Sequence, residues 1–267
     1  MYAVDLGKSL HRKRTWLLAG ILGGIPIVMV LALRANPPRA GHAGDTPFLF
    51  PILTNGFFAA LSGLSVIQPY LLPLVTGVFA GDAIAGEAQA GTLRMLLVRP
   101  VTRERLVLAK YAAAMTLVGA CVSVVVATGI AAGGWAFGLG PLPTLSGTTL
   151  PAGAALARIV LSAAFIVAVV SGVASIGIWI STLTENGPAA AVTTAAIAVV
   201  SEILDRIPSF FSIHRYLPTH GWLGFVDLFR FPVELQVIRQ SLTLSAAYTA
   251  VFLTLAVAGF RRRDVTS

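Results

Sequence analysis

Residues Ile159–Leu183 have the sequence IVLSAAFIVAVVSGVASIGIWISTL and contain no charged side chain. An α-helix rises about 1.5 Å per residue, and the hydrocarbon core of a bilayer is about 30 Å thick. A run of roughly 17–25 apolar residues is therefore long enough to cross a membrane as a helix. We interpret Ile159–Leu183 as such a membrane-spanning helix, and the rest of the chain can be compared with it.

Five further segments share this apolar character. They lie near residues 15–33, 56–80, 106–132, 188–204 and 242–260. Together the six runs predict an all-α polytopic membrane protein with six transmembrane helices, preceded by an N-terminal arm over residues 1–14 and forming one domain over 15–267. Pro69 and Pro73 interrupt the second run. Because proline lacks a backbone donor, a kink or an unwound turn is expected there.

The composition agrees with a membrane protein. Hydrophobic residues make up 56% of the chain and charged residues only 11%, whereas about 25% is usual for soluble domains. The net charge is +8, but the basic residues flank apolar runs and do not cover a soluble surface. We therefore expect the lipid bilayer, and not nucleic acid, as a partner. Cys121 is the only cysteine, so an internal disulfide or a cysteine-based metal site is excluded.

Lysine and arginine predict the orientation, because they are enriched in cytoplasmic connections. Most of the 19 basic residues lie in the N-terminal arm, in residues 82–105 and in the C-terminal tail. Both termini are therefore expected in the cytoplasm, which requires an even number of spans in the cell (inner or plasma) membrane. The basic stretch His11–Arg14 resembles the start of a signal peptide. The apolar run after it is too long and lacks a cleavage site, so we expect an uncleaved span.

Two segments outside the spans are expected at the membrane surface. Residues 205–240 form a long external connection rich in aromatic and basic side chains, which suit the headgroup layer, so short interfacial helices are predicted. In the N-terminal arm, Tyr2, Leu6 and Leu10 share one helical face, whereas Asp5, Lys8 and Arg12 lie elsewhere. This spacing predicts a cytoplasmic amphipathic helix on the inner leaflet.

Short patterns predict helix contacts and a turn. Gly20–Gly24 and Gly129–Gly133 are G-x-x-x-G pairs, which allow helices to approach closely. We expect them to pack within the chain and not to form a dimer face. The sequence Glu185-Asn-Gly-Pro188 has the chemistry of a tight turn, with proline suited to a first helical turn. It is expected to join the fourth and fifth spans on the cytoplasmic side.

A few polar residues could form sites on the outer side. Glu202 and Arg206 are four positions apart and predict a helix ion pair, or else a role at the exit of a translocation path. His214, His220 and Asp227 could be metal ligands. Their spacing matches no recognised ligand pattern, so contact with lipid headgroups is favoured.

The connection over residues 82–105 is the most informative for function. Residues 86–103 have the sequence GEAQAGTLRMLLVRPVTR. Leu93, Leu96 and Leu97 are spaced to form one apolar stripe on a helix, and Pro100 would end that helix. This pattern predicts a short cytoplasmic helix followed by a sharp turn. Such a helix could transmit force from a soluble partner, although an ordinary charged loop fits the periodicity equally well.

This connection resembles a motif of the permeases of ABC type-2 exporters. Their pattern is approximately E-x-x-x-G-T-L-x-x-L-L-x-x-P-[VI]-[ST]-R, with a lysine several residues later. The matching positions are Glu87, Gly91, Thr92, Leu93, Leu96, Leu97, Pro100, Val101, Thr102, Arg103 and Lys110. Thr102 stands where serine is commoner, which keeps the hydroxyl group. Six spans, inside termini and a long last external connection also agree, so the resemblance covers nearly the whole chain.

The resemblance implies a coupling helix that docks in a groove of a nucleotide-binding subunit. The residues that it assigns to coupling are Glu87, Gly91, Thr92, Leu93, Arg94, Leu96, Leu97, Pro100 and Arg103. That ABC ATPase would bind ATP and Mg²⁺, and a second permease, identical or related, would complete the pathway. The chain has no G-x-x-x-x-G-K-[ST] phosphate loop. We therefore expect a transport subunit that is not itself an enzyme and holds no cofactor or metal.

Two other classes of function stay open. A stand-alone secondary transporter or channel usually needs an ionisable group near mid-membrane, and no predicted span has Asp, Glu, Lys or His at its middle. A membrane enzyme acting on lipid needs a catalytic cluster, for which only the weak histidine grouping is available. The favoured function is the permease subunit of an ATP-driven ABC exporter. The Ser, Thr, Gly and aliphatic side chains of the spans favour an apolar or amphipathic substrate.

Overall fold

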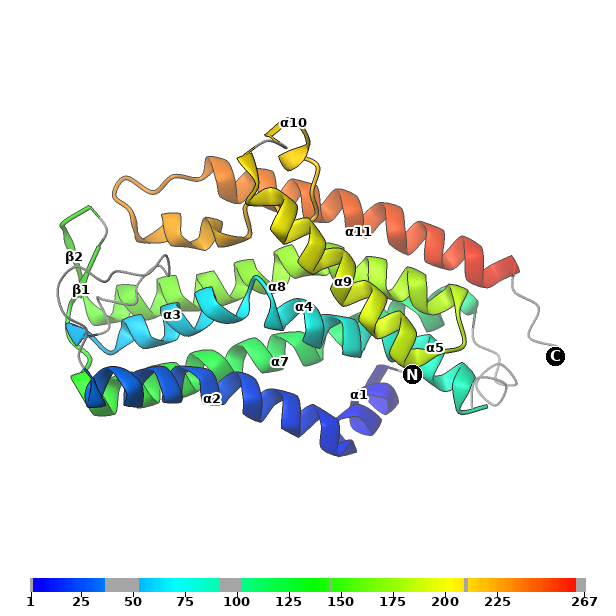
Figure 1. The fold of residues 1–267 in the computed structure, drawn as a ribbon, viewed down its shortest axis with the longest axis horizontal. Coiled ribbons are helices and arrows are strands. Elements are labelled where there is room, and N and C mark those ends of the chain that lie inside the picture. Colours follow the sequence, from blue (N-terminus) through cyan, green and yellow to red (C-terminus); the bar gives the residue numbers. More distant parts are fainter. Residues whose placement is uncertain (1, 37–52, 92–101, 145, 209–210, 263–267) are drawn as a thin grey trace.

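The computed structural model describes residues 2–36, 53–91, 102–144, 146–208 and 211–262. It is a bundle of long helices that run back and forth between two ends (Figure 1). Six helices in this part of the chain are long and apolar enough to cross a membrane: α2 (Lys13–Ala35), residues Leu71–Gln89, α7 (Arg103–Phe137), α8 (Ala152–Leu183), α9 (Gly187–Asp205) and α11 (Gln236–Arg262). The prediction of an all-α polytopic membrane protein is confirmed.

The second span is broken, as its two prolines predict. It consists of α3 (Phe57–Ile67), α4 (Leu71–Thr76), the π-helix η2 (Gly77–Gly81) and α5 (Asp82–Gln89). The break between α3 and α4 contains Pro69, which offers no backbone N–H. Gln68 secures this break, because its buried Nε2 donates to the carbonyl oxygen of Trp222 at 2.7 Å. The helical path continues beyond the expected end at residue 80, so residues 82–89 extend this span and are not part of a separate connection.

Two spans are much longer than a bilayer requires. α7 has 35 residues and α8 has 32, which correspond to about 52 and 48 Å of helix. The hydrocarbon core is only about 30 Å thick, so both helices extend past it. A two-strand hairpin of β1 (Leu142–Pro143) and β2 (Thr149–Leu150) joins their far ends. The sequence did not predict this hairpin, because strands of two residues show no periodicity.

Glycine allows α3 to pack directly on α7. A Cβ atom added at Gly129 would lie 2.5 Å from the Cα of Ala60, and one at Gly133 would overlap the carbonyl oxygen of Gly56. The predicted packing of this pair within the chain is confirmed. The prediction is wrong for Gly20 and Gly24, where an added Cβ meets nothing within 4 Å. Their face of α2 is turned away from the described part of the bundle.

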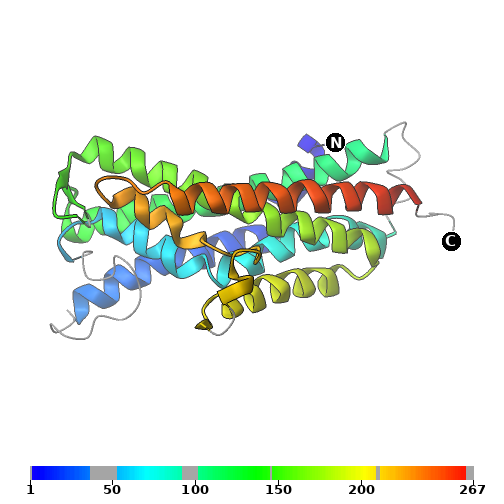
Figure 2. The same cartoon turned by 90° about the horizontal axis from the view of Figure 1, so that it is seen from above.

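One end of the bundle gathers both chain termini, and the two views agree on this (Figures 1 and 2). It holds α1 (Tyr2–His11), the end of α5, the start of α7 and the turn between α8 and α9. That turn has the predicted chemistry. The Oδ1 of Asn186 accepts a hydrogen bond from the amide of Ala189 at 3.0 Å, and Pro188 lies in the first turn of α9. Asparagine thus caps the helix in the way its preference predicts.

The segment between α9 and α11 contains α10 (Phe211–His214) and the 3₁₀ helix η4 (Trp222–Phe229). Three aromatic residues of this segment face the bundle and not its surface. Trp222, Phe225 and Phe229 are buried, because η4 packs against α8 and α11. Tyr216 and Phe231 are more than half exposed, as interfacial residues would be.

Candidate functional site

The structure describes the two ends of the predicted coupling segment. Glu87 lies in the last turn of α5, Gly91 follows that helix, and Arg103 begins α7. The other residues assigned to coupling lie outside the described residues: Thr92, Leu93, Arg94, Leu96, Leu97 and Pro100. The apolar stripe therefore stays a prediction. The structure shows the two anchors of the segment, which are Glu87 with Gly91 at its first end and Arg103 at its second end.

Gly91 ends the helical path of the second span. Its φ of +67° is in the left-handed region, and its amide donates to the carbonyl oxygen of Ala88 at 3.0 Å. A left-handed glycine just after a helix is a common termination signal, because it costs glycine no Cβ clash. α5 therefore ends at Gln89. This corrects the expectation of one short helix over the whole motif, since the helix that contains Glu87 ends before Gly91.

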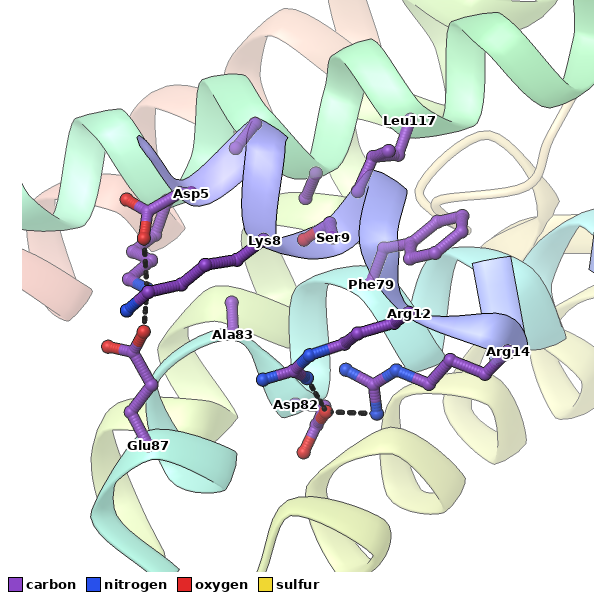
Figure 3. Close-up of a pocket in the computed structure, with 13 residues that line it drawn as sticks. Asp5, Lys8, Ser9, Arg12, Arg14, Phe79, Asp82, Ala83, Glu87 and Leu117 are labelled. Carbon is purple, nitrogen blue, oxygen red and sulfur yellow. Dashed lines mark hydrogen bonds and ion pairs between the residues drawn. The ribbon is translucent and has the colours of Figure 1, made fainter. Parts of the chain in front are cut away.

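Lys110 joins three helices inside the bundle. Its Nζ lies 2.8 Å from Oδ1 of Asp5 on α1 and 2.5 Å from Oε1 of Glu87 on α5. The three side chains are only 6, 7 and 9% exposed in the order Lys110, Asp5, Glu87. Figure 3 shows the carboxylates of Asp5 and Glu87 facing each other, with the dashed lines of their interactions meeting between them. Removing charges from water costs several kcal/mol per ion unless they are paired, so this cluster holds α1, α5 and α7 in one arrangement.

This burial changes the expected positions of two residues. Glu87 faces the interior and not the surface on which a soluble subunit would dock. The N-terminal arm is helical, as predicted, but Asp5 faces the bundle and is buried. The amphipathic interpretation had placed Asp5 away from the packed face. It failed because a buried lysine on another helix gives Asp5 a partner that sequence periodicity does not reveal.

Asp82 connects the arm to the start of α5. Its carboxylate forms an ion pair with Arg14, and Arg12 Nη1 lies 3.7 Å from the same Oδ2 (Figure 3). Glycine provides the space for this side chain, because a Cβ atom at Gly86 or Gly187 would overlap Asp82 Oδ1. The amide of Gly187 also donates to Oε1 of Gln89 at 3.1 Å. The start of α9 thus packs closely against Asp82 at the start of α5 and is hydrogen-bonded to Gln89 at its end.

Ser181 ties α5 to α8. Its fully buried Oγ accepts from the amides of Ile84 and Ala85, at 2.9 and 2.8 Å. These amides follow the π-helix η2, and such wide turns often mark functional positions. Buried backbone amides require a partner, which here comes from another helix. Sequence reasoning missed Ser181 because a single serine in an apolar span carries no signal of this role.

A small cavity of about 40 Å³ lies between α1, α5 and α7 and is lined by the same charged residues (Figure 3). It has room for water but not for an organic substrate. Oδ2 of Asp5 is buried and has no hydrogen-bond partner within the described residues. Size and charge indicate that this polar cluster, defined by Asp5, Asp82, Glu87, Lys110 and Ser181, connects helices and does not bind substrate.

Arg103 anchors the other end of the coupling segment. Its Nη1 donates to the carbonyl oxygens of Phe260 and Arg261, at 2.9 and 2.8 Å. These carbonyls close α11, where a cation is favoured by the helix dipole. Glu104 and Arg261 form an adjacent ion pair. The start of α7 is therefore held against the end of α11.

The residues considered as a metal site have other partners, although the rings of His214 and His220 lie 6.5 Å apart between centroids. His220 Nδ1 pairs with Asp205 at 2.8 Å, and Asp227 pairs with Arg230 at 3.0 Å. Within the described ranges no three His, Cys, Asp or Glu side chains lie together as metal ligands would. The predicted pair of Glu202 and Arg206 is confirmed at 3.0 Å.

Comparison with known proteins points to the same family as the motif. The family described as "ABC-2 family transporter protein" matches residues 7–265. The "Probable ABC transporter permease protein NosY" of Stutzerimonas stutzeri is 34% identical over 99 residues, which cover 37% of this chain and 32% of that protein. Its namesake in Pseudomonas aeruginosa is 40% identical over 53 residues, or 20% and 19%. The matches thus span a third or less of these relatives. The family match covers nearly the whole chain, and the protein therefore belongs to the ABC-2 transporter family.

Proposed function

We propose that this chain is the transmembrane permease subunit of an ATP-driven ABC exporter, and that a separate nucleotide-binding subunit docks on its coupling segment. The observation that carries the proposal is the anchoring of both ends of that segment. Its first end is fixed through the polar cluster to α1, α7, α8 and α9. Its second end is fixed through Arg103 to α11.

This arrangement gives a path for force through the bundle. ATP and Mg²⁺ would be bound by the partner ATPase, whose closure would move the coupling segment. The displacement would reach α5 and α7 along the chain. From α5 it would pass to α8 through Ser181 and to α1 through Glu87 and Lys110. In this proposal Glu87 acts through Lys110 and does not contact the ATPase, while the leucine stripe provides the docking surface.

The proposed cargo is apolar or amphipathic, and the proposed direction is export. In the described spans, buried ionisable groups such as Lys110 and Glu202 lie near helix ends. Most other buried side chains of the spans are aliphatic, aromatic, serine or threonine. A second permease, either a copy of this chain or a related protein, would complete the pathway, and both termini would face the cytoplasm.

Reconstitution tests the proposal. The chain should be co-purified from native membranes with a protein that contains a Walker A motif, and both should be expressed together and placed in liposomes. We expect ATP hydrolysis only by the pair, with loss of hydrolysis and transport when the partner's Walker lysine is replaced. ATP hydrolysis by the isolated chain, or transport that continues with the inactive partner, would contradict the proposal.

A further inference from the structure

The start of α11 carries a polar face that is open to the surroundings. Only 11% of the most apolar window of α11 is buried, the lowest share of the six spans. Its first turns expose Gln236, Arg239, Gln240 and Thr243, whereas Ser241 faces the bundle. Exposed polar and cationic side chains cannot lie in the hydrocarbon core without a large cost. This part of α11 must therefore lie outside the core or against a polar partner.

The length of α11 places Arg239 in a headgroup layer. At about 1.5 Å per residue, Arg239 lies about 33 Å from Arg261 along the helix. The hydrocarbon core is about 30 Å thick. Figure 1 shows α11 running from the side of η4 to the end that holds both termini. When Arg261 is at the membrane surface on the side of the termini, Arg239 reaches the headgroups of the opposite leaflet.

An open groove accompanies this face. It consists of two adjoining hollows of about 490 and 550 Å³, and Gln240 and Thr243 line both. Arg239 lines the first hollow, and Arg215 and His220 line the second. No Asp or Glu is among the described residues that line either hollow. The lining side chains of the groove are therefore basic or neutral, and the carboxylate of Asp205 beside it is paired with His220 at 2.8 Å.

The two arginines of the groove differ from others nearby. The guanidinium of Arg239 has no hydrogen bond or ion pair within the described residues. Arg215 stacks over the ring of Tyr216 at 4.7 Å and donates to its hydroxyl at 2.5 Å, which holds it in place without a carboxylate. By contrast, Arg206 pairs with Glu202, and Arg230 pairs with Asp227. Arg215 and Arg239 therefore keep their positive charge available to an external anion.

We propose that this groove binds the phosphate of an anionic phospholipid in the leaflet opposite the termini. Arg215 and Arg239 donate to the phosphate oxygens, since guanidinium groups form strong charge-assisted bonds to phosphate. The side-chain amide of Gln240 adds a neutral donor. The acyl chains lie along the apolar outer face of α11, where Val251 and Leu255 are exposed. Position in the headgroup layer next to that face favours a lipid over a free phosphate ion.

Lipid titration of the full chain tests this site. Native mass spectrometry of detergent-purified protein gives the affinity for phosphatidylglycerol in the wild type and in Arg215→Gln/Arg239→Gln. We expect the affinity to fall at least about tenfold in this variant. The control Arg206→Gln/Arg230→Gln removes the same amount of charge, but from arginines that already have carboxylate partners. It should change the affinity for phosphatidylglycerol less than about twofold. Arg215→Lys/Arg239→Lys should retain part of the affinity, because lysine keeps the charge but loses the bidentate geometry.

Three results would overturn the site. Equal loss in the control would show that only overall charge matters. Displacement of the lipid by millimolar inorganic phosphate would make the ion, and not the lipid, the ligand. A fall in the dimer fraction with unchanged lipid affinity would assign the groove to a second copy of the chain. The lysine variant, with its full charge, provides the comparison should the glutamine variant not fold. None of these measurements depends on ATP or on transport.

Discussion

Lys110 and Asp5 are 105 positions apart in the sequence, and their side chains form an ion pair of 2.8 Å that is almost closed to solvent. Glu87 contacts the same ammonium group from another helix. One cation thus serves two buried carboxylates, and the three residues do not make equal contributions. Loss of the cation leaves two carboxylates without compensation, whereas loss of one carboxylate leaves an intact pair.

Lys110→Met should destabilise the protein far more than Asp5→Asn. Removing one partner of a buried ion pair costs about 3–5 kcal/mol. Asp5→Asn should cost less than half of that, because Lys110 and Glu87 still pair. The apparent melting temperature in detergent measures both effects. Hydrogen exchange adds a local measurement, since Asp5→Asn should raise exchange in α1 without affecting α8. Equal melting temperatures for the two variants would show that Lys110 does not connect the carboxylates.

Ser181→Ala should weaken the connection between α5 and α8. The substitution removes the buried acceptor of two amides, and an unsatisfied buried donor costs about 1–3 kcal/mol. The control is Ser123→Ala, because Ser123 is exposed and bonds only within its own helix. We expect a lower melting temperature and faster amide exchange over residues 82–89 for Ser181→Ala alone. Similar behaviour of the two variants would contradict the proposed connection.

Gly133→Ala should disrupt the packing of α3 on α7. The added methyl group would overlap the carbonyl oxygen of Gly56, and a backbone cannot yield as a flexible side chain can. Gly119→Ala lies on the same helix and meets its nearest atom at 3.9 Å. Alanine also has a better helix propensity than glycine, so this control should be neutral or stabilising. The yield of monodisperse protein after purification compares them, and equal yields would argue against the close contact.

The sequence predicted the spans well because the bilayer imposes a strong pattern. The fifth span differs from the prediction only at its ends, and Pro188 lies in its first turn as expected. Helix lengths were underestimated wherever a helix leaves the membrane. The prediction ended the third span before Gly133 and began the fourth after Arg158, but α7 continues to Phe137 and α8 begins at Ala152. Glycine is a poor helix former and arginine is charged, so both suggest an end of a span although the helix continues through them.

The candidate site was only partly predictable. Glu87 and Lys110 belong to a motif that the sequence shows, whereas their contact with Asp5 depends on how α1 folds back onto α7. Asp82 and Ser181 gave no signal, because their partners come from segments distant in the sequence. A motif indicates which residue types matter, while tertiary contacts decide which of them are buried.

Both termini should face the cytoplasm. In a chain with Cys121→Ala, single cysteines at positions 4 and 266 test this, and Thr149→Cys in the hairpin at the other end is the control (Figure 1). Val4 and Thr149 are exposed, so cysteines there can react. A membrane-impermeant maleimide should label only position 149 in intact cells, and all three after permeabilisation. Labels on opposite sides for positions 4 and 266 would require an odd number of crossings.

Leu93→Asp/Leu96→Asp should separate the chain from its ATPase without unfolding it. The sequence places both leucines on one face of a predicted helix that begins after the left-handed turn at Gly91. This helix is too short to span the membrane and too apolar to remain uncovered in the cytosol. Losing one well-packed leucine contact costs about 2–5 kcal/mol, which weakens docking by an order of magnitude or more.

The variant should insert and melt like the wild type, because it keeps the ion pair of Glu87 with Lys110 and the hydrogen bonds of Arg103 to the end of α11. Pull-down of the co-expressed ATPase and transport in liposomes should both be lost. Leu93→Met/Leu96→Met is the matched control, since methionine keeps the apolar volume and should retain both activities. A double aspartate variant that still binds its ATPase and exports would show that another surface forms the dock. Lys110→Met should give the opposite combination. It should keep the ATPase bound, because the docking surface is unchanged, but should reduce transport, because the transmission of force is disturbed.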